Sequence, residues 1–297
     1  VLGYLVGEDQ QILRTVDRRL GEPLDTAWAD QPDSYQILSE QDAAYARGQQ
    51  PSAVFRKSKP TKMADVGPDQ RDWSLRHTVY LQLPEPLTVG QTYTVDFNGD
   101  QLADVRFTYD PVTLRSEAVQ VSQVGFAPND PTKVAFLSTW MGNGGPLSYS
   151  PDLQFAVINQ ETGETAYEGT VELSKAKDEP EDNRDRNYTG TDVYMMDFSS
   201  VTQPGRYRVV VEGIGSSFPF KIQPQAWQDA FYVSVRGLFH QRSGIALGPP
   251  YTDYQRPRPF HPDDGVRVYQ STVPLMDTRM GLNGEVDVFE VLQETRT

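Results

Sequence analysis

FYVSVRGLFHQRSG, residues 231–244, is the stretch that decides how this chain is organised. It belongs to a longer segment in which apolar side chains recur at the spacing that places them on one face of a helix. That face is an apolar stripe made of Trp227, Ala230, Phe231, Ser234, Val235, Leu238 and Phe239. Pro224 suits the start of a helix and Gly244 suits its end. The sequence therefore predicts an amphipathic helix within residues 224–244.

The region before this helix has the pattern of short β-strands separated by turns. The segments with this pattern are 118–126, 133–137, 154–158, 165–173, 192–198, 206–211 and 217–222. Glycine and proline stand between them, as in the Gln203–Gly205 turn. Several short strands with regular turn signals are typical of a β-sandwich. We therefore expect one sandwich domain over residues 113–223.

Residues 1–112 have a similar pattern and predict a second β domain. Strand-like segments occur at 11–16, 34–38, 77–83, 91–97 and 105–109. Asn98 and Gly99 form a strong hairpin signal before the last of these segments. The segment from Arg56 to Arg71 is polar and carries proline, so it is predicted to be a long loop.

The two β domains share a weak repeat in which a glycine comes just before a tyrosine-bearing strand. Gly90 precedes Tyr93 in the first domain, and Gly205 precedes Tyr207 in the second. A tyrosine at such a corner can hydrogen-bond back to the backbone and fix two strands. We expect a structural role for both tyrosines, with sugar binding as the lesser alternative.

The charge of the chain limits the classes of partner. The formal net charge is −14 at pH 7, so neither nucleic acid nor an anionic membrane surface is an expected partner. No apolar run reaches the roughly 20 residues of a membrane-spanning helix. There is no cysteine, which excludes disulfides and thiolate metal sites. The acidic segment 177–187 lacks the spacing of a calcium loop and is predicted to be a solvated surface loop.

Several phrases in residues 117–270 together resemble family 9 glycoside hydrolases, the cellulase-type family. In the second β domain these phrases are QVSQVGFAP at 120–128, DFSSVTQPGRYRV at 197–209 and GSSFPF at 215–220. They are similar to the immunoglobulin-like module at the N-terminus of that family. FHQRSG at 239–244 and FHPDD at 260–264 look like its first barrel helix and the loop after it. Residues 1–112 carry no such resemblance.

The resemblance completes the expected fold, which is mainly β. Two immunoglobulin-like β-sandwiches, 1–112 and 113–223, would be followed over 224–297 by the first helical part of an (α/α)6 barrel. The family cleaves β-linked glucans with inversion, using an acid and a base roughly 6.5–9.5 Å apart. Its Asp-Ala-Gly-Asp motif and its distal glutamate are missing here, so no residue is assigned as catalytic. Asp263 and Asp264 do not match that context and are expected to belong to a loop or cap.

The family's structural zinc site is also not expected. Ser243 and Phe260 stand where the resemblance would place cysteine ligands, which leaves His261 alone. One histidine cannot make a tetrahedral zinc site, so no metal or cofactor is expected. His261 is instead interpreted as a packed or hydrogen-bonding residue, and His77 and His240 as structural residues.

The resemblance implies the N-terminal, non-catalytic portion of a secreted or cell-surface bacterial enzyme that degrades polysaccharide. The expected partner of the 224–244 helix is the C-terminal catalytic barrel, since an isolated stripe of this kind needs a covering surface. One alternative is a structural or adhesive surface-assembly protein. Another is a carbohydrate-binding module, which would need Trp28, Trp73 or Trp140 as exposed platforms, although core packing is expected for each.

Overall fold

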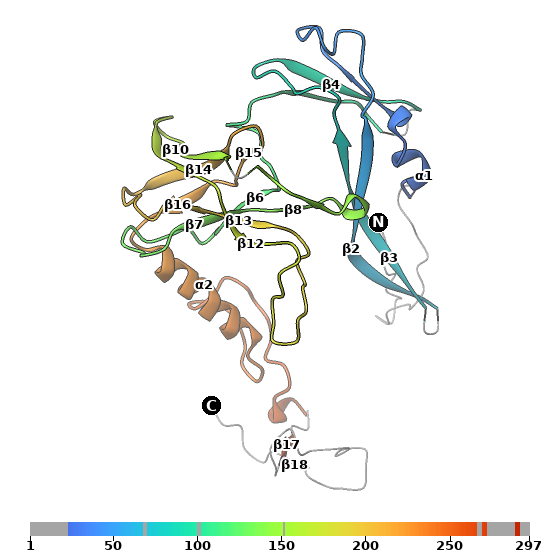
Figure 1. The fold of residues 1–297 in the computed structure, drawn as a ribbon. Coiled ribbons are helices and arrows are strands. Elements are labelled where there is room, and N and C mark those ends of the chain that lie inside the picture. The colour runs from blue at the N-terminus through green and yellow to red at the C-terminus, as the bar shows by residue number, and fades with distance from the viewer. Residues whose placement is uncertain are drawn as a thin grey trace. The chain divides into compact units, whose positions relative to one another are not determined.

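The computed structural model describes residues 23–67, 70–99, 102–150, 152–265, 269–271 and 289–291. These residues are mainly β and form two compact units, Val1–Ala226 and Trp227–Thr297. Figure 1 shows the order of the elements along the chain. The expected strand at 11–16 lies outside the described residues.

The first part of the chain contains a small antiparallel sheet of order β1-β4-β5. Its strands are β1 (Tyr35–Leu38), β4 (Thr92–Phe97) and β5 (Val105–Thr108), preceded by the short helix α1 (Thr26–Ala29) and the turn η1 (Pro32–Ser34). Ile37, Tyr45 and Tyr93 are fully buried and form its core. The Tyr93 hydroxyl accepts a hydrogen bond from the backbone N–H of Thr88 at 2.8 Å, which confirms the predicted corner.

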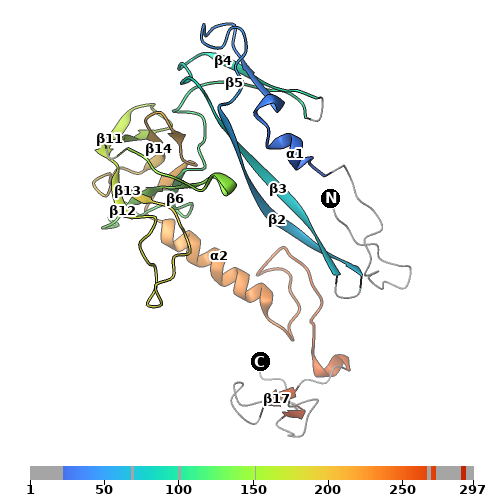
Figure 2. The same ribbon diagram turned by 45° about the vertical axis from the view of Figure 1, so that its right-hand side comes forward.

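The predicted loop at 56–71 is wrong. The structure places two long strands there, β2 (Ala53–Gly67) and β3 (Gln70–Gln82), which pair antiparallel. Figure 2 shows them as a two-stranded ribbon, and within the described residues they pair with no other strand. A register shift follows Pro60, where the missing N–H interrupts the ladder. The outer half of the ribbon, which is the half nearer the β2–β3 turn, carries exposed side chains such as Lys59, Met63 and Trp73. Its sequence therefore lacks the alternation of a half-buried strand.

Residues 119–222 form a sandwich of two antiparallel sheets. One sheet has the order β11-β10-β14-β15, with β16 also paired to β14, and the other has the order β12-β13-β7-β6. The strands of the first are β10 (Gln154–Asn159), β11 (Thr165–Thr170), β14 (Gly205–Val211), β15 (Gly215–Ser216) and β16 (Phe220–Ile222). Those of the second are β6 (Val119–Val121), β7 (Val134–Leu137), β12 (Glu172–Lys175) and β13 (Val193–Asp197). One buried apolar cluster fills the space between the sheets, as the alternation predicts.

The sandwich has two features that fix its edges. The Tyr207 hydroxyl donates to the carbonyl of Gln203 at 2.9 Å, which confirms the second predicted corner. Phe126 accepts from the backbone N–H of Gln223 and donates its own N–H to Lys221, at 2.9 and 3.0 Å. The short strands β8 (Thr139–Trp140) and β9 (Pro146–Leu147) flank the turn η2 (Gly142–Gly144) outside both sheets.

The second unit contains the predicted amphipathic helix as α2 (Ala226–Gln241). Downstream, Leu247 and Arg256 pair across an irregular segment, and Gly244 donates its N–H to Pro259 at 2.8 Å. The turn η3 (Pro262–Asp264) follows, and the short strands β17 (Tyr269–Ser271) and β18 (Phe289–Val291) pair antiparallel. None of the helices in the described segments is long and apolar enough to cross a membrane.

Candidate functional site

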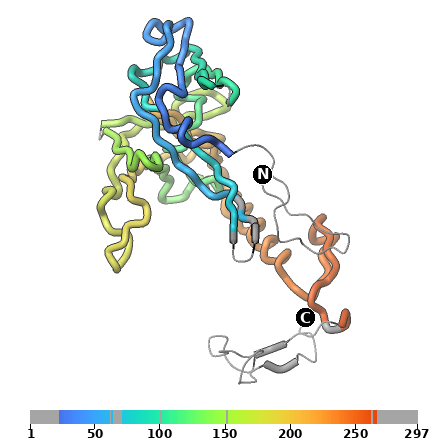
Figure 3. The backbone as a smooth tube through the Cα atoms, turned by 90° about the vertical axis from the view of Figure 1, so that its right-hand side faces the viewer, coloured from blue at the N-terminus to red at the C-terminus, as the bar shows by residue number. Residues whose placement is uncertain are grey.

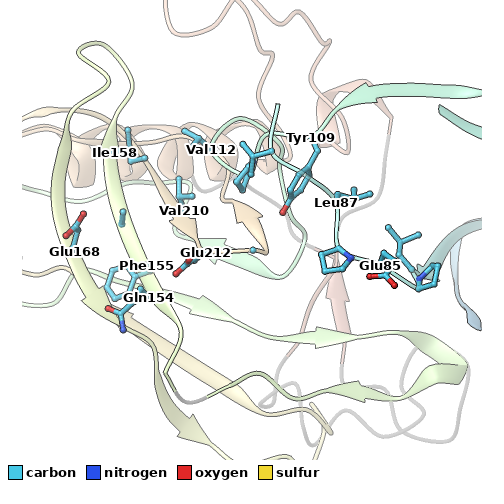
Figure 4. A pocket seen from close by; sticks show the side chains of 17 residues that line it. Glu85, Leu87, Tyr109, Val112, Gln154, Phe155, Ile158, Glu168, Val210 and Glu212 are labelled. Carbon is cyan, nitrogen blue, oxygen red and sulfur yellow. The ribbon is translucent and has the colours of Figure 1, made fainter. Parts of the chain in front are cut away.

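A hollow lies between the first sheet's loops and one sheet of the sandwich. Its volume is about 1170 Å³. One wall comes from the loop 83–89 and the segment 109–112, and the other comes from the outer face of β10, β11 and β14. In Figure 4, Leu87 and Val112 lie on the first side, and Ile158 and Val210 lie on the sandwich side. These aliphatic side chains give the hollow an apolar floor.

Three carboxylates stand around this floor. Glu168 and Glu212 come from the sandwich, and Glu85 comes from the opposite loop. All three side chains are exposed, and none forms an ion pair with another residue that the structure describes. An apolar floor with three free carboxylates suits a ligand that is both aliphatic and cationic. Sequence analysis missed this site, because segments far apart in the chain contribute to it.

A cluster of polar contacts joins the base of the ribbon, around Arg56, Lys57 and Tyr80, to the sandwich. The Lys57 ammonium lies 3.0 Å from the Glu117 carboxylate, and the Tyr80 hydroxyl donates to the same carboxylate oxygen. Burial opposes the ionisation of Glu117, but the hydrogen bonds from Tyr80 and Lys57 outweigh it and hold its pKa below the usual value. The same contacts raise the pKa of Lys57 against the effect of burial. The cluster therefore remains an ion pair at neutral pH.

The turn η2 completes this joint. The backbone N–H of Arg56 donates to the side-chain carbonyl of Asn143 at 2.7 Å. The Lys57 ammonium also donates to the carbonyl of Trp140 at 3.3 Å. The Arg56 guanidinium forms an ion pair with Asp30 at 2.6 Å. The same stretch of β2 is therefore also held to the residues between α1 and η1. These contacts fix the base of the ribbon in place and pair its charged side chains.

The histidines have the structural surroundings that the sequence predicted. His261 is buried, and its Nδ1 accepts the backbone N–H of Asp263 at 3.2 Å. His240 shares a 2.8 Å hydrogen bond with Thr252, and His77 shares one of 2.8 Å with Ser58. Asp264, the last residue of η3, forms an ion pair with Arg258 at 2.9 Å. Among the described residues, no group of three or more histidine, aspartate or glutamate side chains is placed to hold a metal ion.

The three tryptophans named as possible sugar platforms differ in exposure. Trp28 is half-buried, donates its ring N–H to the carbonyl of Asn98 at 2.7 Å and packs beside Tyr35. Trp73 and Trp140 are 49% and 44% exposed, against the expectation of core packing. They come from the ribbon and from β8, so they do not share one strand.

The acidic loop 177–187 has its own internal contacts within the long β12–β13 connection, which is yellow in Figure 3. The Asp182 carboxylate forms an ion pair with Arg186 at 2.6 Å and accepts the backbone N–H of Arg184. The hydrogen bond from Arg186 lowers the pKa of Asp182 to about 2. Hydrogen bonds from Thr189, with further help from Lys175, lower the pKa of Glu181 to about 2.

We expect this loop to open only in strong acid. A carboxyl whose folded pKa is depressed contributes stability above its unfolded pKa, about 4. That contribution is lost as the pH falls through the folded value of about 2. Carboxyl carbon NMR should therefore show Asp182 and Glu181 titrating near pH 2, with the Arg184 amide shifting in parallel. A midpoint near 4 for Asp182 would contradict the paired loop.

The apolar stripe of α2 is uncovered in the structure. Trp227, Phe231 and Leu238 are 56%, 69% and 70% exposed. Tyr232 and Val233 are also exposed, so large apolar side chains extend beyond the predicted stripe. A soluble protein seldom leaves so many large apolar side chains in water on one helix, which marks this face as an interaction surface.

Comparison with known proteins identifies the sandwich. Residues 115–216 match the family described as "Cellulase N-terminal ig-like domain". This part of the chain is a cellulase-type ig-like domain. The match covers β6 to β15 and excludes both the ribbon and α2. The expectation of an immunoglobulin-like module there is thereby confirmed, while a second such domain over 1–112 stays a prediction.

The relatives of the ig-like domain include named polysaccharide-degrading enzymes. Endoglucanase D of Acetivibrio thermocellus is 27% identical over 152 residues, which are 51% of this chain and 21% of that protein. A cellodextrinase of Butyrivibrio fibrisolvens is 28% identical over 143 residues, 48% of this chain and 22% of that protein. The chain thus spans about a fifth of the length of these relatives.

Solved structures of glycoside hydrolase family 9 proteins also match part of the chain. A metagenome-derived glycoside hydrolase family 9 endoglucanase is 27% identical, with a TM-score of 0.38, over 47% of this chain and 24% of its own. A family 9 protein of Bacteroides ovatus is 21% identical, with a TM-score of 0.40, over 55% of this chain and 26% of its own.

Proposed function

We propose that this chain is the N-terminal, non-catalytic portion of a secreted or cell-surface glycoside hydrolase of family 9. In this proposal α2 opens a helical catalytic barrel that lies C-terminal to the described ig-like domain. The barrel hydrolyses a β-linked glucan or a related glycan with inversion, and the β-rich residues before α2 support it. The single observation that carries the proposal is the ig-like domain followed directly by an exposed amphipathic helix.

The physical argument concerns the location of the chemistry. Inverting hydrolysis needs a carboxylic acid and a carboxylate roughly 6.5–9.5 Å apart across a bound sugar. The hollow's carboxylates surround an aliphatic floor, and the ion-paired Glu117 is held by Lys57 and Tyr80. The proposal therefore assigns the reaction to a barrel that packs on α2.

The role of the ig-like domain in this proposal is mechanical support. Ala226, the first residue of α2, is buried and donates its N–H to the carbonyl of Gln223. Gln223 in turn bonds to Phe126 in the domain. The helix therefore starts directly from a hydrogen-bonded edge of the sandwich. A barrel that begins with this helix has its first residues anchored at that edge.

The proposal predicts a clear difference in activity between two proteins. Residues 1–297 alone should release no reducing sugar from barley β-glucan or carboxymethylcellulose. The complete protein encoded by the same reading frame should release it, and proton NMR should show the inverted anomer as the first product. A complete protein that binds these glucans without cleaving them would contradict the proposal and favour a binding or adhesive role.

A further inference from the structure

The hollow beside the ig-like domain and the outer half of the ribbon have complementary chemistry. The hollow combines an aliphatic floor with the free carboxylates of Glu85, Glu168 and Glu212. At about 1170 Å³ it exceeds the roughly 300–1,000 Å³ of common small-molecule pockets. Its aromatic side chains are the half-buried Tyr109 and the buried Phe155, so it has no fully exposed ring as a platform for a sugar. These properties favour a polypeptide segment as the occupant.

The ribbon provides a segment with the matching properties. Trp73 and Leu75 alternate along β3, so their side chains share one face, together with their cross-strand partners Met63 and Pro60. All four residues are exposed. The face thus presents one aromatic ring among three aliphatic side chains. This composition suits burial against an aliphatic surface better than the stacking of successive sugar rings.

The ribbon also carries free positive charge. Lys59 and Arg76 are cross-strand partners on the opposite face, and both are exposed. Neither side chain has an ion-pair partner among the described residues. Their long aliphatic stems let the charged ends reach past the edge of a two-stranded ribbon. In a chain of net charge −14, such a cationic and apolar segment is complementary to the acidic rim of the hollow.

We propose that the outer ribbon of one molecule docks in the hollow of a second copy of this chain. The apolar face with Trp73 and Leu75 covers the aliphatic floor, and Lys59 and Arg76 pair with the carboxylates at the rim. Because the two surfaces differ, the contact is head-to-tail and leaves one free ribbon and one free hollow in each dimer. It therefore extends into short chains or closed rings as the concentration rises. This inference does not depend on the proposed function.

Sedimentation velocity on the full chain tests the proposal, because the two surfaces can be changed separately. The ribbon variant carries Lys59→Glu and Arg76→Glu, and the hollow variant carries Glu168→Lys and Glu212→Lys. Each variant alone should raise the dissociation constant of self-association by at least about tenfold, since like charges then face each other. All four substitutions lie at exposed positions, and circular dichroism should confirm that the folds are retained.

Mixing and recombination make the test specific. An equimolar mixture of the two variants should associate again, because the intact ribbon of one chain fits the intact hollow of the other and the charge-reversed ribbon fits the charge-reversed hollow. Combining all four substitutions in one chain should restore self-association with reversed charges. Adding Trp73→Ser to the hollow variant should weaken the association of this mixture, because that chain carries the intact ribbon.

Several results would overturn the proposal. One is a wild-type chain that stays monomeric at about 100 μM, a weak limit for a specific contact. Another is association that ignores the charge reversals, as contact through α2 would. A third is a monomer whose Trp73 fluorescence shifts with a soluble β-glucan, since the ribbon would then be a sugar-binding face.

Discussion

Replacing Gly125 with alanine should strongly destabilise the ig-like domain. Gly125 has a φ of +81°, and a Cβ atom there would lie 2.3 Å from the carbonyl oxygen of Lys221. The neighbouring residue Phe126 forms backbone hydrogen bonds with Lys221 and Gln223. Its ring also packs edge-on against Phe198 at a centroid distance of 5.5 Å. The added methyl group would therefore separate residues 125–126 from residues 221–223 and break the contacts between them.

The expected loss is about 3 kcal/mol in the free energy of unfolding. A left-handed backbone costs a non-glycine residue roughly 1–2 kcal/mol. Partial loss of the Phe126 packing and of the two hydrogen bonds adds a comparable amount. For a unit of this size the melting temperature should fall by about 10 °C. Differential scanning calorimetry of the full chain measures both quantities.

Gly163→Ala is the matched control. Gly163 has a φ of +75°, but a Cβ atom there meets nothing within 4 Å. The free energy of unfolding of Gly163→Ala should fall only by the backbone strain of roughly 1–2 kcal/mol. Equal losses for Gly125→Ala and Gly163→Ala would show that the close approach to Lys221 has no energetic importance.

Replacing Gly142 with alanine should detach the base of the ribbon from the ig-like domain. A Cβ atom at Gly142 would lie 2.1 Å from the carbonyl oxygen of Arg56 and 2.6 Å from the Cα of Lys57. Both neighbours are backbone atoms of β2, which cannot move without breaking the joint. We expect the hydrogen bond from Arg56 to Asn143 to be lost, and the pair of Lys57 with Glu117 to loosen.

Amide hydrogen exchange reports this detachment directly. The Arg56 amide should exchange at least about tenfold faster in Gly142→Ala, which corresponds to a loss of roughly 1.4 kcal/mol in local stability. The interior of the sandwich, such as Val209, should keep its protection. Gly145→Ala is the control, because Gly145 has a φ of +71° with nothing within 4 Å and strains the same turn. Similar exchange at Arg56 in both variants would contradict the steric argument.

Local patterns in the sequence predicted the elements whose burial is periodic. The strands around Val134–Leu137, Gln154–Asn159 and Gly205–Val211 alternate because one face of each packs into the core. α2 was predicted because its apolar residues recur at helical spacing. The corners of Tyr93 and Tyr207 were predicted from the preceding glycines.

The ribbon and the hollow could not be predicted in the same way. Over residues 53–61 the described side chains show no alternating core face, so the polar sequence with Pro60 predicts a loop. The sequence predicts a strand only at 77–83, whereas β3 runs over Gln70–Gln82. The hollow depends on contacts between residues far apart in the sequence, and Glu85, Glu168 and Glu212 carry no local signature.

The central claim is that the apolar face of α2 exists to pack against a catalytic barrel. Hydrogen–deuterium exchange of α2, residues 226–241, tests it most directly, in residues 1–297 alone and in the complete protein of the same reading frame. The claim predicts that α2 amides are protected at least about a hundredfold more in the complete protein, because Phe231 and Leu238 become buried there. Equal exchange of α2 in the two proteins would contradict it.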